Sequence, residues 1–228
     1  MRGAVMAVAA LLALLAGGPA TAAEPVTERG YLLVMGSFTD PEKRKAYSAA
    51  LPPIYAAHGG RYLGVGGPGR GVEVLAGGWA PRGMVLALFD RPEAVQAFWD
   101  SPAYRAAVDL RQGAGRFDVL RLSGGVPGPA GPKSYLVEFL AGTADASAYR
   151  AAAGRTAAAH GGTVLVDLPA AATRLLEGEA PVPGFAHLLV LELPAGAADA
   201  AWTALRDEPA RRALEPVSTV RLTGLPPG

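Results

Sequence analysis

The sequence contains no cysteine, and that absence excludes several kinds of protein at once. Disulfide bonds and thiolate metal sites cannot form, and the lipid-modified cysteine of a lipoprotein is missing too. An excess of positive charge is also lacking, because 21 Lys and Arg residues stand against 20 Asp and Glu residues, without basic clusters. Electrostatic binding of nucleic acid depends on such clusters. We therefore expect neither a disulfide-stabilised domain nor a nucleic-acid partner.

Long hydrophobic runs are scarce as well, and the clearest one lies at the N-terminus. Ala4–Ala16 is apolar but shorter than the roughly 20 residues that cross a bilayer. Arg2 precedes this run, and the small residues Ala20-Thr21-Ala22 follow it. The order predicts a secretory signal peptide over residues 1–23, with an N-terminal membrane anchor as the alternative. Cleavage after Ala22 or Ala23 leaves an exported chain, periplasmic or secreted, without a membrane span.

A repeat organises the rest of the chain. The stretch His58-Gly59-Gly60-Arg61-Tyr62-Leu63-Gly64-Val65 returns as His160-Gly161-Gly162-Thr163-Val164-Leu165-Val166, and an Ala-rich run ends at each. Glycine after a helix adopts the left-handed conformation that ends the last turn without a steric penalty. Each stretch therefore marks a corner between a helix and a strand, and the chain is an internal duplication.

Apolar runs and capping residues outline the first copy, residues 30–124. Uninterrupted apolar runs predict buried strands at Tyr31–Met35 and Met84–Phe89. The pairs Asp40-Pro41 and Ser101-Pro102 each predict the start of a helix, because Asp and Ser cap helices and Pro fits the first turn.

Glycines place a turn at residues 67–71, and the turn predicts a hairpin between Arg61–Gly66 and Val72–Trp79. A last strand is expected at Phe117–Leu122. The order of strand, helix, hairpin, strand, helix and strand is the βαββαβ plan of a ferredoxin-like α+β domain.

A Gly- and Pro-rich linker at residues 125–132 precedes a second copy at residues 133–224. The corresponding segments run along the whole copy: Tyr135–Phe139 with Tyr31–Met35, Tyr149 with Tyr47, Leu176-Glu177-Gly178 with Leu75-Ala76-Gly77, and Trp202 with Trp99. We therefore expect tandem ferredoxin-like repeats.

The first copy also resembles a known family through particular segments: Tyr31, Tyr47, Gly59–Leu63, Leu75–Arg82, Met84–Phe89, Ser101–Tyr104 and Arg111. They resemble domain-of-unknown-function family 1330, of the dimeric α+β barrel superfamily, and the second copy resembles it only in outline. The resemblance implies two sheets paired into a barrel, here within one monomeric chain as a pseudo-dimer. The superfamily includes cofactor-free monooxygenases, isomerases, haem-dependent enzymes and binding proteins, and the fold does not choose among them.

Four side chains of the first copy are candidates for a ligand pocket: Arg61, Trp79, Tyr104 and Arg111. Two guanidinium groups and two amphipathic aromatic rings suit a small acidic or aromatic molecule. The alternative is structural, with Arg61 paired to Glu73 across the hairpin and the two aromatic rings in the core.

The second copy does not repeat this pattern. The acid that the resembled family tends to place before the hairpin glycine is Glu177 in the second copy but Ala76 in the first. Thr163, Ala180 and Arg211 stand at the positions of Arg61, Trp79 and Tyr104. Neither copy has the whole polar pattern, so we expect one asymmetric site in or near the first copy.

The three histidines suggest local roles. His58 and His160 are expected at helix ends, where the helix dipole favours a cation, and His58 remains a fifth ligand candidate beside Arg61. His187 lies in an apolar run and is expected to be buried and neutral, with one backbone partner. No spacing fits a metal site, so we expect no metal and no cofactor.

These observations predict an exported protein that binds a small acidic or aromatic molecule. The alternatives are a cofactor-independent monooxygenase or isomerase of the barrel type, and a structural or assembly role. The sequence leaves open whether the protein is an enzyme, because it has no Ser-His-Asp order, paired carboxylate motif or nucleotide fingerprint.

Overall fold

The computed structural model describes residues 28–80, 82–141, 145–214 and 217–226. The predicted signal peptide lies outside these residues. The first half of the chain contains β1 (Arg29–Phe38), α1 (Pro41–Ala57), β2 (Gly60–Pro68), β3 (Gly71–Ala76), β4 (Gly83–Phe89), α2 (Pro92–Asp100), α3 (Pro102–Asp109) and β5 (Gly115–Gly124). The second half contains β6 (Lys133–Ala141), α4 (Ser147–Ala159), β7 (Thr163–Pro169), β8 (Arg174–Glu177), β9 (Phe185–Pro194), α5 (Ala198–Arg206), α6 (Pro209–Arg212) and β10 (Val217–Thr223).

The helix boundaries follow from the predicted caps. The Asp40 side chain accepts hydrogen bonds from the backbone N–H groups of Glu42 and Lys43, both at 3.0 Å, and so begins α1. Gly59 and Gly161 follow the last turns of α1 and α4 at φ of +66° and +73°. The two repeated corners are therefore confirmed as helix ends.

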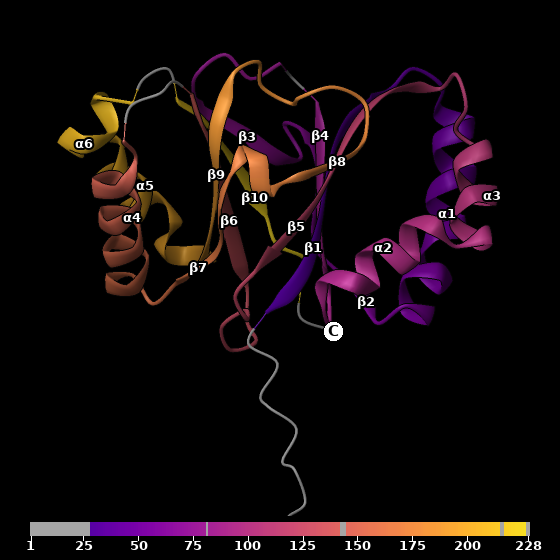
Figure 1. The fold of residues 1–228 in the computed structure, drawn as a ribbon, viewed down its shortest axis with the longest axis horizontal. Helices are drawn as coiled ribbons and strands as arrows, with labels where there is room; N and C mark the ends of the chain where they lie inside the picture. Colours follow the sequence, from indigo (N-terminus) through magenta and orange to yellow (C-terminus); the bar gives the residue numbers. More distant parts are fainter. Residues whose placement is uncertain (1–27, 81, 142–144, 215–216, 227–228) are drawn as a thin grey trace, which may run out of the picture.

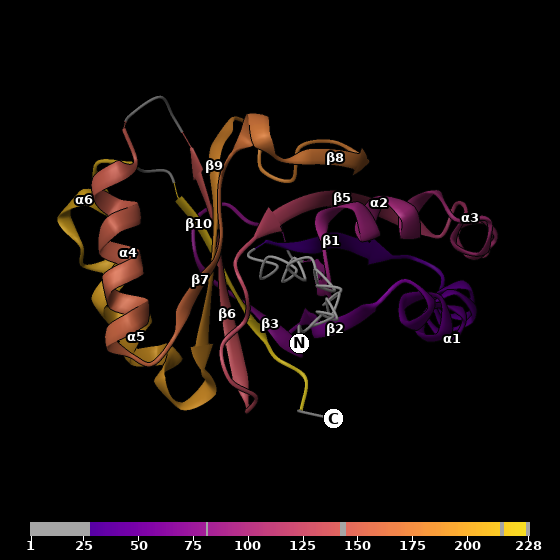
Figure 2. The same ribbon diagram turned by 60° about the horizontal axis from the view of Figure 1, so that its bottom comes forward.

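The strands form one curled sheet in the order β7-β9-β6-β10-β3-β2-β4-β1-β5-β8. Four strands of each half occur in the ferredoxin-like order, β2-β4-β1-β5 and β7-β9-β6-β10. The two four-stranded groups face each other, and the helices of each half cover its outer side (Figures 1 and 2). This arrangement confirms the predicted α+β barrel fold.

The predicted hairpin between β2 and β3 is wrong. β3 meets β2 only at Gly67 and Pro68, in parallel, and pairs instead in the antiparallel sense with β10 of the second half. Gly69 and Gly71 have φ of +69° and +79°, which turns the chain away from β2. The free edge of β10 then supplies the backbone partners that β3 needs.

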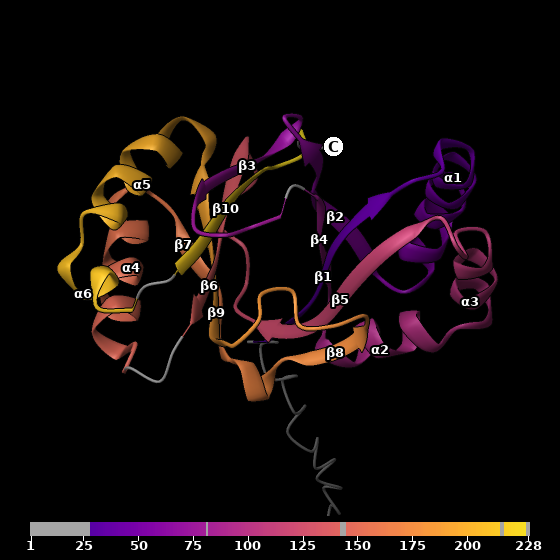
Figure 3. The same cartoon turned by 90° about the horizontal axis from the view of Figure 1, so that it is seen from above.

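The second half makes the matching exchange. β8 leaves β7 and pairs with β5 of the first half, as β3 pairs with β10 (Figure 3). Each exchanged strand is followed by a glycine, Gly77 or Gly178, at φ of +81° or +83°. A side chain at either glycine would collide with a carbonyl oxygen of the opposite half. The two halves are thus joined by reciprocal strand exchange.

The core has three layers. One apolar cluster fills the barrel between the two groups of strands and includes Leu33, Leu86, Phe139 and Val190. The other two clusters lie between each group of strands and its own helices. No helix in the described part of the chain is long and apolar enough to cross a membrane.

Candidate functional site

Trp79 follows the exchanged strand β3 and contacts both halves. Its ring is only 5% exposed and stacks on Phe139 of β6, with 5.4 Å between the ring centroids. The guanidinium carbon of Arg82 lies 4.4 Å from the Trp79 ring centroid. Arg82 also pairs with Asp118 of β5 and donates a hydrogen bond to the carbonyl of Pro181. These contacts fix Trp79 at the junction of the halves.

A groove of about 610 Å³ lies beside Trp79. Its walls come from the turn between β2 and β3, from Trp79 and Arg82, and from Ser134, Arg221 and Thr223 of the second half. Small-molecule sites typically have volumes of about 300–1,000 Å³. The groove is therefore large enough for a small organic ligand.

Two buried donors in the groove residues lack hydrogen-bond partners among the described residues. They are the indole Nε1 of Trp79 and the Nε of Arg82. Leaving a buried donor unsatisfied costs about 1–3 kcal/mol. A ligand oxygen that accepts from either group would remove that cost.

Arg221 supplies the other guanidinium group of the groove. Its Nε donates to Glu73 at 3.0 Å, and a second nitrogen pairs with Asp199 of α5. Partial burial lowers the pKa of Arg221, but the bonds to Glu73 and Asp199 raise it above its ordinary value. The sequence-based alternative that pairs Glu73 with Arg61 is therefore wrong, because Glu73 bonds to Arg221.

A second polar feature joins Arg111 to Glu177. Two parallel hydrogen bonds of 2.8 and 2.5 Å connect the guanidinium to the carboxylate, which comes from β8 of the opposite half. Arg111 is 5% exposed, and its guanidinium carbon lies 4.2 Å from the Phe117 ring centroid and 5.1 Å from that of Tyr47. Strand exchange thus combines a cation of one half with the acid of the other.

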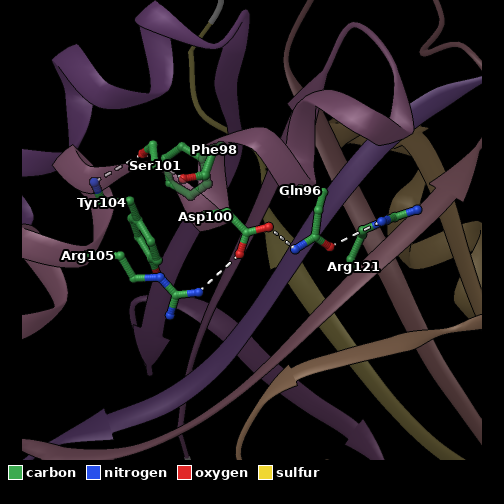
Figure 4. A network of polar contacts seen from close by, with 7 residues as sticks. All are labelled: Gln96, Phe98, Asp100, Ser101, Tyr104, Arg105 and Arg121. Carbon is green, nitrogen blue, oxygen red and sulfur yellow. Dashed lines mark hydrogen bonds and ion pairs between the residues drawn. The ribbon is translucent and has the colours of Figure 1, made fainter.

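Tyr104 lies beside this ion pair because Ser101 ends one helix and begins the next. The Ser101 hydroxyl donates to the carbonyl of Phe98 and accepts from the Tyr104 N–H (Figure 4). The Tyr104 hydroxyl then lies 3.2 Å from that of Tyr47. Burial raises the pKa of Tyr104 far above its ordinary value. The helix start predicted at Ser101-Pro102 is confirmed, and it places Tyr104 in the layer between sheet and helices.

The structure does not bring the predicted ligand residues together. Tyr104 and Arg111 share one cluster, but Trp79 lines the groove. Arg61 is exposed and forms no hydrogen bond or ion pair within the described ranges. His58 lies at the end of α1, where its Nδ1 is 2.9 Å from the Ile54 carbonyl and its ring packs on Phe98. The ligand roles of these residues remain predictions.

The other two histidines, His160 and His187, contact different kinds of partner. His160 repeats the helix-end arrangement, with Nδ1 2.9 Å from the Thr156 carbonyl, so the predicted position of both histidines at helix ends is confirmed. His187 is buried as predicted, but its partner is a carboxylate rather than the backbone. Its Nε2 lies 2.5 Å from Asp167, which Arg150 also binds.

Sequence reasoning missed Arg82 in the groove and did not foresee that Arg111 would meet Glu177. It also missed a buried network in the second half. Glu138 accepts from Tyr149 at 2.5 Å and from Thr219 at 2.8 Å, and Arg211 donates to the Thr219 hydroxyl at 2.9 Å. The single charge within the apolar run Tyr135–Phe139 was the available signal.

Comparison with known proteins finds a family match for the first half of the chain, which contains Trp79, Tyr104 and Arg111. Residues 29–124 match the family described as "Domain of unknown function (DUF1330)". The first half of the chain therefore matches this family model. The resemblance predicted for that half is confirmed, whereas the match does not extend to residues 133–224, whose origin as a second DUF1330 copy stays a prediction. No curated protein matches the chain.

Solved structures resemble the chain in fold. A mutant chlorite dismutase from Candidatus Nitrospira defluvii, in complex with cyanide, aligns with a TM-score of 0.50 and 10% identity, covering 87% of this chain and 91% of that one. A candidate monooxygenase from Lactobacillus acidophilus NCFM aligns at 0.45 and 12%, covering 87% and 98%. A Rhodopseudomonas palustris protein of unknown function aligns at 0.35 and 21%, covering 46% and 86%. At 10% identity, the likeness of this chain to the chlorite dismutase concerns the fold alone.

Proposed function

We propose that the protein binds a small organic molecule in the groove beside Trp79. The observation that carries the proposal concerns Trp79, which lines the groove. Its indole N–H is buried and has no hydrogen-bond acceptor among the described residues. Polar groups buried during folding normally find partners, and those that do not need an explanation. A ligand that presents an oxygen to the indole supplies the missing partner.

The groove favours a ligand with an oxyanion or carbonyl attached to an apolar body. Arg82 adds a second unpaired N–H, and Val72 and Val74 add apolar wall. Glu73 is the carboxylate in the groove wall, and its bond to Arg221 makes it a poor general base. This is why we propose binding rather than proton-transfer catalysis.

Replacing Trp79 with Phe should weaken binding of such a ligand by about two- to tenfold, because one hydrogen bond is worth about 0.5–1.5 kcal/mol. The Phe ring retains an aromatic surface for Phe139 and Arg82. We would titrate the mature chain with benzoate and with benzamide, its neutral analogue, by calorimetry. Benzoate should bind more tightly than benzamide.

Trp202→Phe is the matched control, because Trp202 lies on α5 against Arg211 and away from the groove walls. It should leave the affinity unchanged. Equal losses in both variants, or no loss in Trp79→Phe, would contradict the assignment to the groove. Melting temperatures would show whether either variant has lost its fold.

We also propose that binding takes place outside the cytoplasm, after cleavage of residues 1–23. The support is the order of Arg2, the Ala4–Ala16 run and Ala20-Thr21-Ala22. When the full chain is produced in a bacterium, intact-mass measurement of the envelope fraction should show a protein that begins at Ala23 or Glu24. A soluble cytoplasmic product that retains Met1 would disprove export.

A further inference from the structure

Arg111 and Glu177 are exposed to very different degrees. The Arg111 side chain is 5% exposed, whereas that of Glu177 is 31% exposed. The guanidinium is fixed from within by the rings of Phe117 and Tyr47. The carboxylate therefore lies on the solvent side of the pair, where another oxyanion can approach the same nitrogens.

The element that carries Glu177 is short and lies at an edge. β8 has four residues, is the last strand of the sheet, and pairs with β5 through an irregular register between Val119 and Leu120. Its Leu175 side chain is 46% exposed. A four-residue edge strand is held by few backbone bonds, so its side chains are less constrained than those of the central strands.

The exchanged strand β3, which pairs with the second half, has no acid at the position that corresponds to Glu177. Ala76 of β3 pairs with Thr219 where Glu177 of β8 pairs with Val119, so Ala76 occupies the matching place on the exchanged strand. The acid beside Arg211 is instead Glu138, which is fully buried in the central strand β6. The carboxylate beside Arg211 therefore belongs to a central strand of the sheet, whereas the carboxylate beside Arg111 belongs to an edge strand.

A buried guanidinium cannot be left without an anion at low cost, because the uncompensated charge is strongly destabilising. Any movement of Glu177 away from Arg111 must therefore be balanced by another anion. The fork of the guanidinium, which already holds Glu177 through two parallel bonds, matches a planar carboxylate.

We propose that Arg111 is a second, carboxylate-binding site, which Glu177 occupies as an internal substitute until a small carboxylic acid takes its place. The site is built by both halves, because Arg111, Tyr47 and Phe117 come from the first half and the displaced acid from the second. It shares no residue with the lining of the groove beside Trp79. Inorganic phosphate shares the oxyanion chemistry and is the competing ligand.

The test compares Glu177→Gln with the unaltered mature chain, because the amide cannot compete as an anion for Arg111. Acetate, benzoate and inorganic phosphate would each be titrated by calorimetry. We expect both carboxylates to bind about ten- to a hundredfold more tightly to the variant, and phosphate to gain less. Glu179→Gln is the control, since Glu179 is an exposed acid on the same segment, and it should behave like the unaltered chain.

Three results would overturn the proposal. They are no gain for either carboxylate in Glu177→Gln, an equal gain in Glu179→Gln, and a gain for phosphate alone. In the double variant Glu177→Gln/Arg111→Gln, which removes both charges of the pair, the gain in carboxylate affinity should disappear, and its persistence would also contradict the assignment. Trp79→Phe should leave the gain intact, so failure of this site and failure of the groove are distinguishable.

Discussion

Produced without residues 125–228, the first half should not persist as a folded monomer. Its strands β1, β4 and β5 contribute Leu33, Leu86 and Leu122 to the apolar cluster of the barrel interior, and the second half supplies the other side of that cluster. Burial of each such side chain stabilises the fold by about 1.5–3 kcal/mol. Exposing five of them would cost about 8–15 kcal/mol, which equals the whole stability of an ordinary domain.

The exchanged strand adds a second reason. β3 pairs mainly with β10, so in the isolated half its backbone groups would lose most of their partners. Sedimentation of residues 24–124 should show self-association, in which a second copy replaces the missing half, or an unfolded chain. The full mature chain should sediment as a monomer. A stable, folded monomer of residues 24–124 would refute the mutual dependence of the halves.

A single substitution in the buried network of Glu138, Tyr149, Thr219 and Arg211 should lower the stability of the protein more than a substitution in its other polar clusters. Arg211→Met should lower the free energy of unfolding by about 3–5 kcal/mol, because it leaves Glu138 buried without its cation. The first half shows how to remove the network whole, since Val34, Tyr104 and Val119 stand at the positions of Glu138, Arg211 and Thr219.

The triple variant Glu138→Val/Arg211→Tyr/Thr219→Val copies that apolar arrangement. It should unfold at the same urea concentration as the unaltered chain or at a higher one, because replacing a complete buried ion pair with packed apolar groups is neutral or stabilising. If Arg211→Met is harmless, or if the triple variant is the less stable of the two, the network does not act as a coupled unit.

Glu138 should also make stability depend on pH. Burial raises its pKa above the ordinary value of 4.5, although hydrogen bonds from Tyr149 and Thr219 and the charge of Arg211 act in the opposite direction. The folded state therefore holds its proton more tightly than the unfolded state. The resulting stabilisation is complete below pH 4.5 and declines as pH rises through the folded pKa, by at most about 1.4 kcal/mol per pH unit. Urea unfolding of Glu138→Gln should lack this decline.

Much of the fold could be predicted because its signals are local. The glycine corners after α1 and α4 and the caps at Asp40 and Ser101 each depend on a few neighbouring residues. The partner of β3 could not be predicted in this way. A strand after a glycine turn favours a hairpin, and only the free edge of β10, about 150 residues away, makes the other pairing available.

The same distinction explains the site. The sequence indicates Trp79, Tyr104 and Arg111 as ligand candidates because their residue types suit ligands. It does not show that Trp79 lies in the groove while Tyr104 and Arg111 lie in another cluster, because that distribution depends on the exchange of strands between the halves. Glu177 was recognised as an acid that the first half lacks, yet its return to Arg111 required the crossing of β8. The pairing of Glu73 with Arg221 likewise follows from the contact between β3 and β10.

The indole N–H signals of the three tryptophans provide the most direct test of ligand binding in the groove. In nitrogen-15 NMR spectra of the mature chain, Trp79, Trp99 and Trp202 each give one such signal, and Trp79→Phe assigns the first. On titration with benzoate, the Trp79 signal should shift strongly, as expected for a hydrogen bond gained by a buried donor, and that of Trp202 should stay in place. Saturable binding of benzoate that leaves the Trp79 signal unmoved would contradict the proposed function.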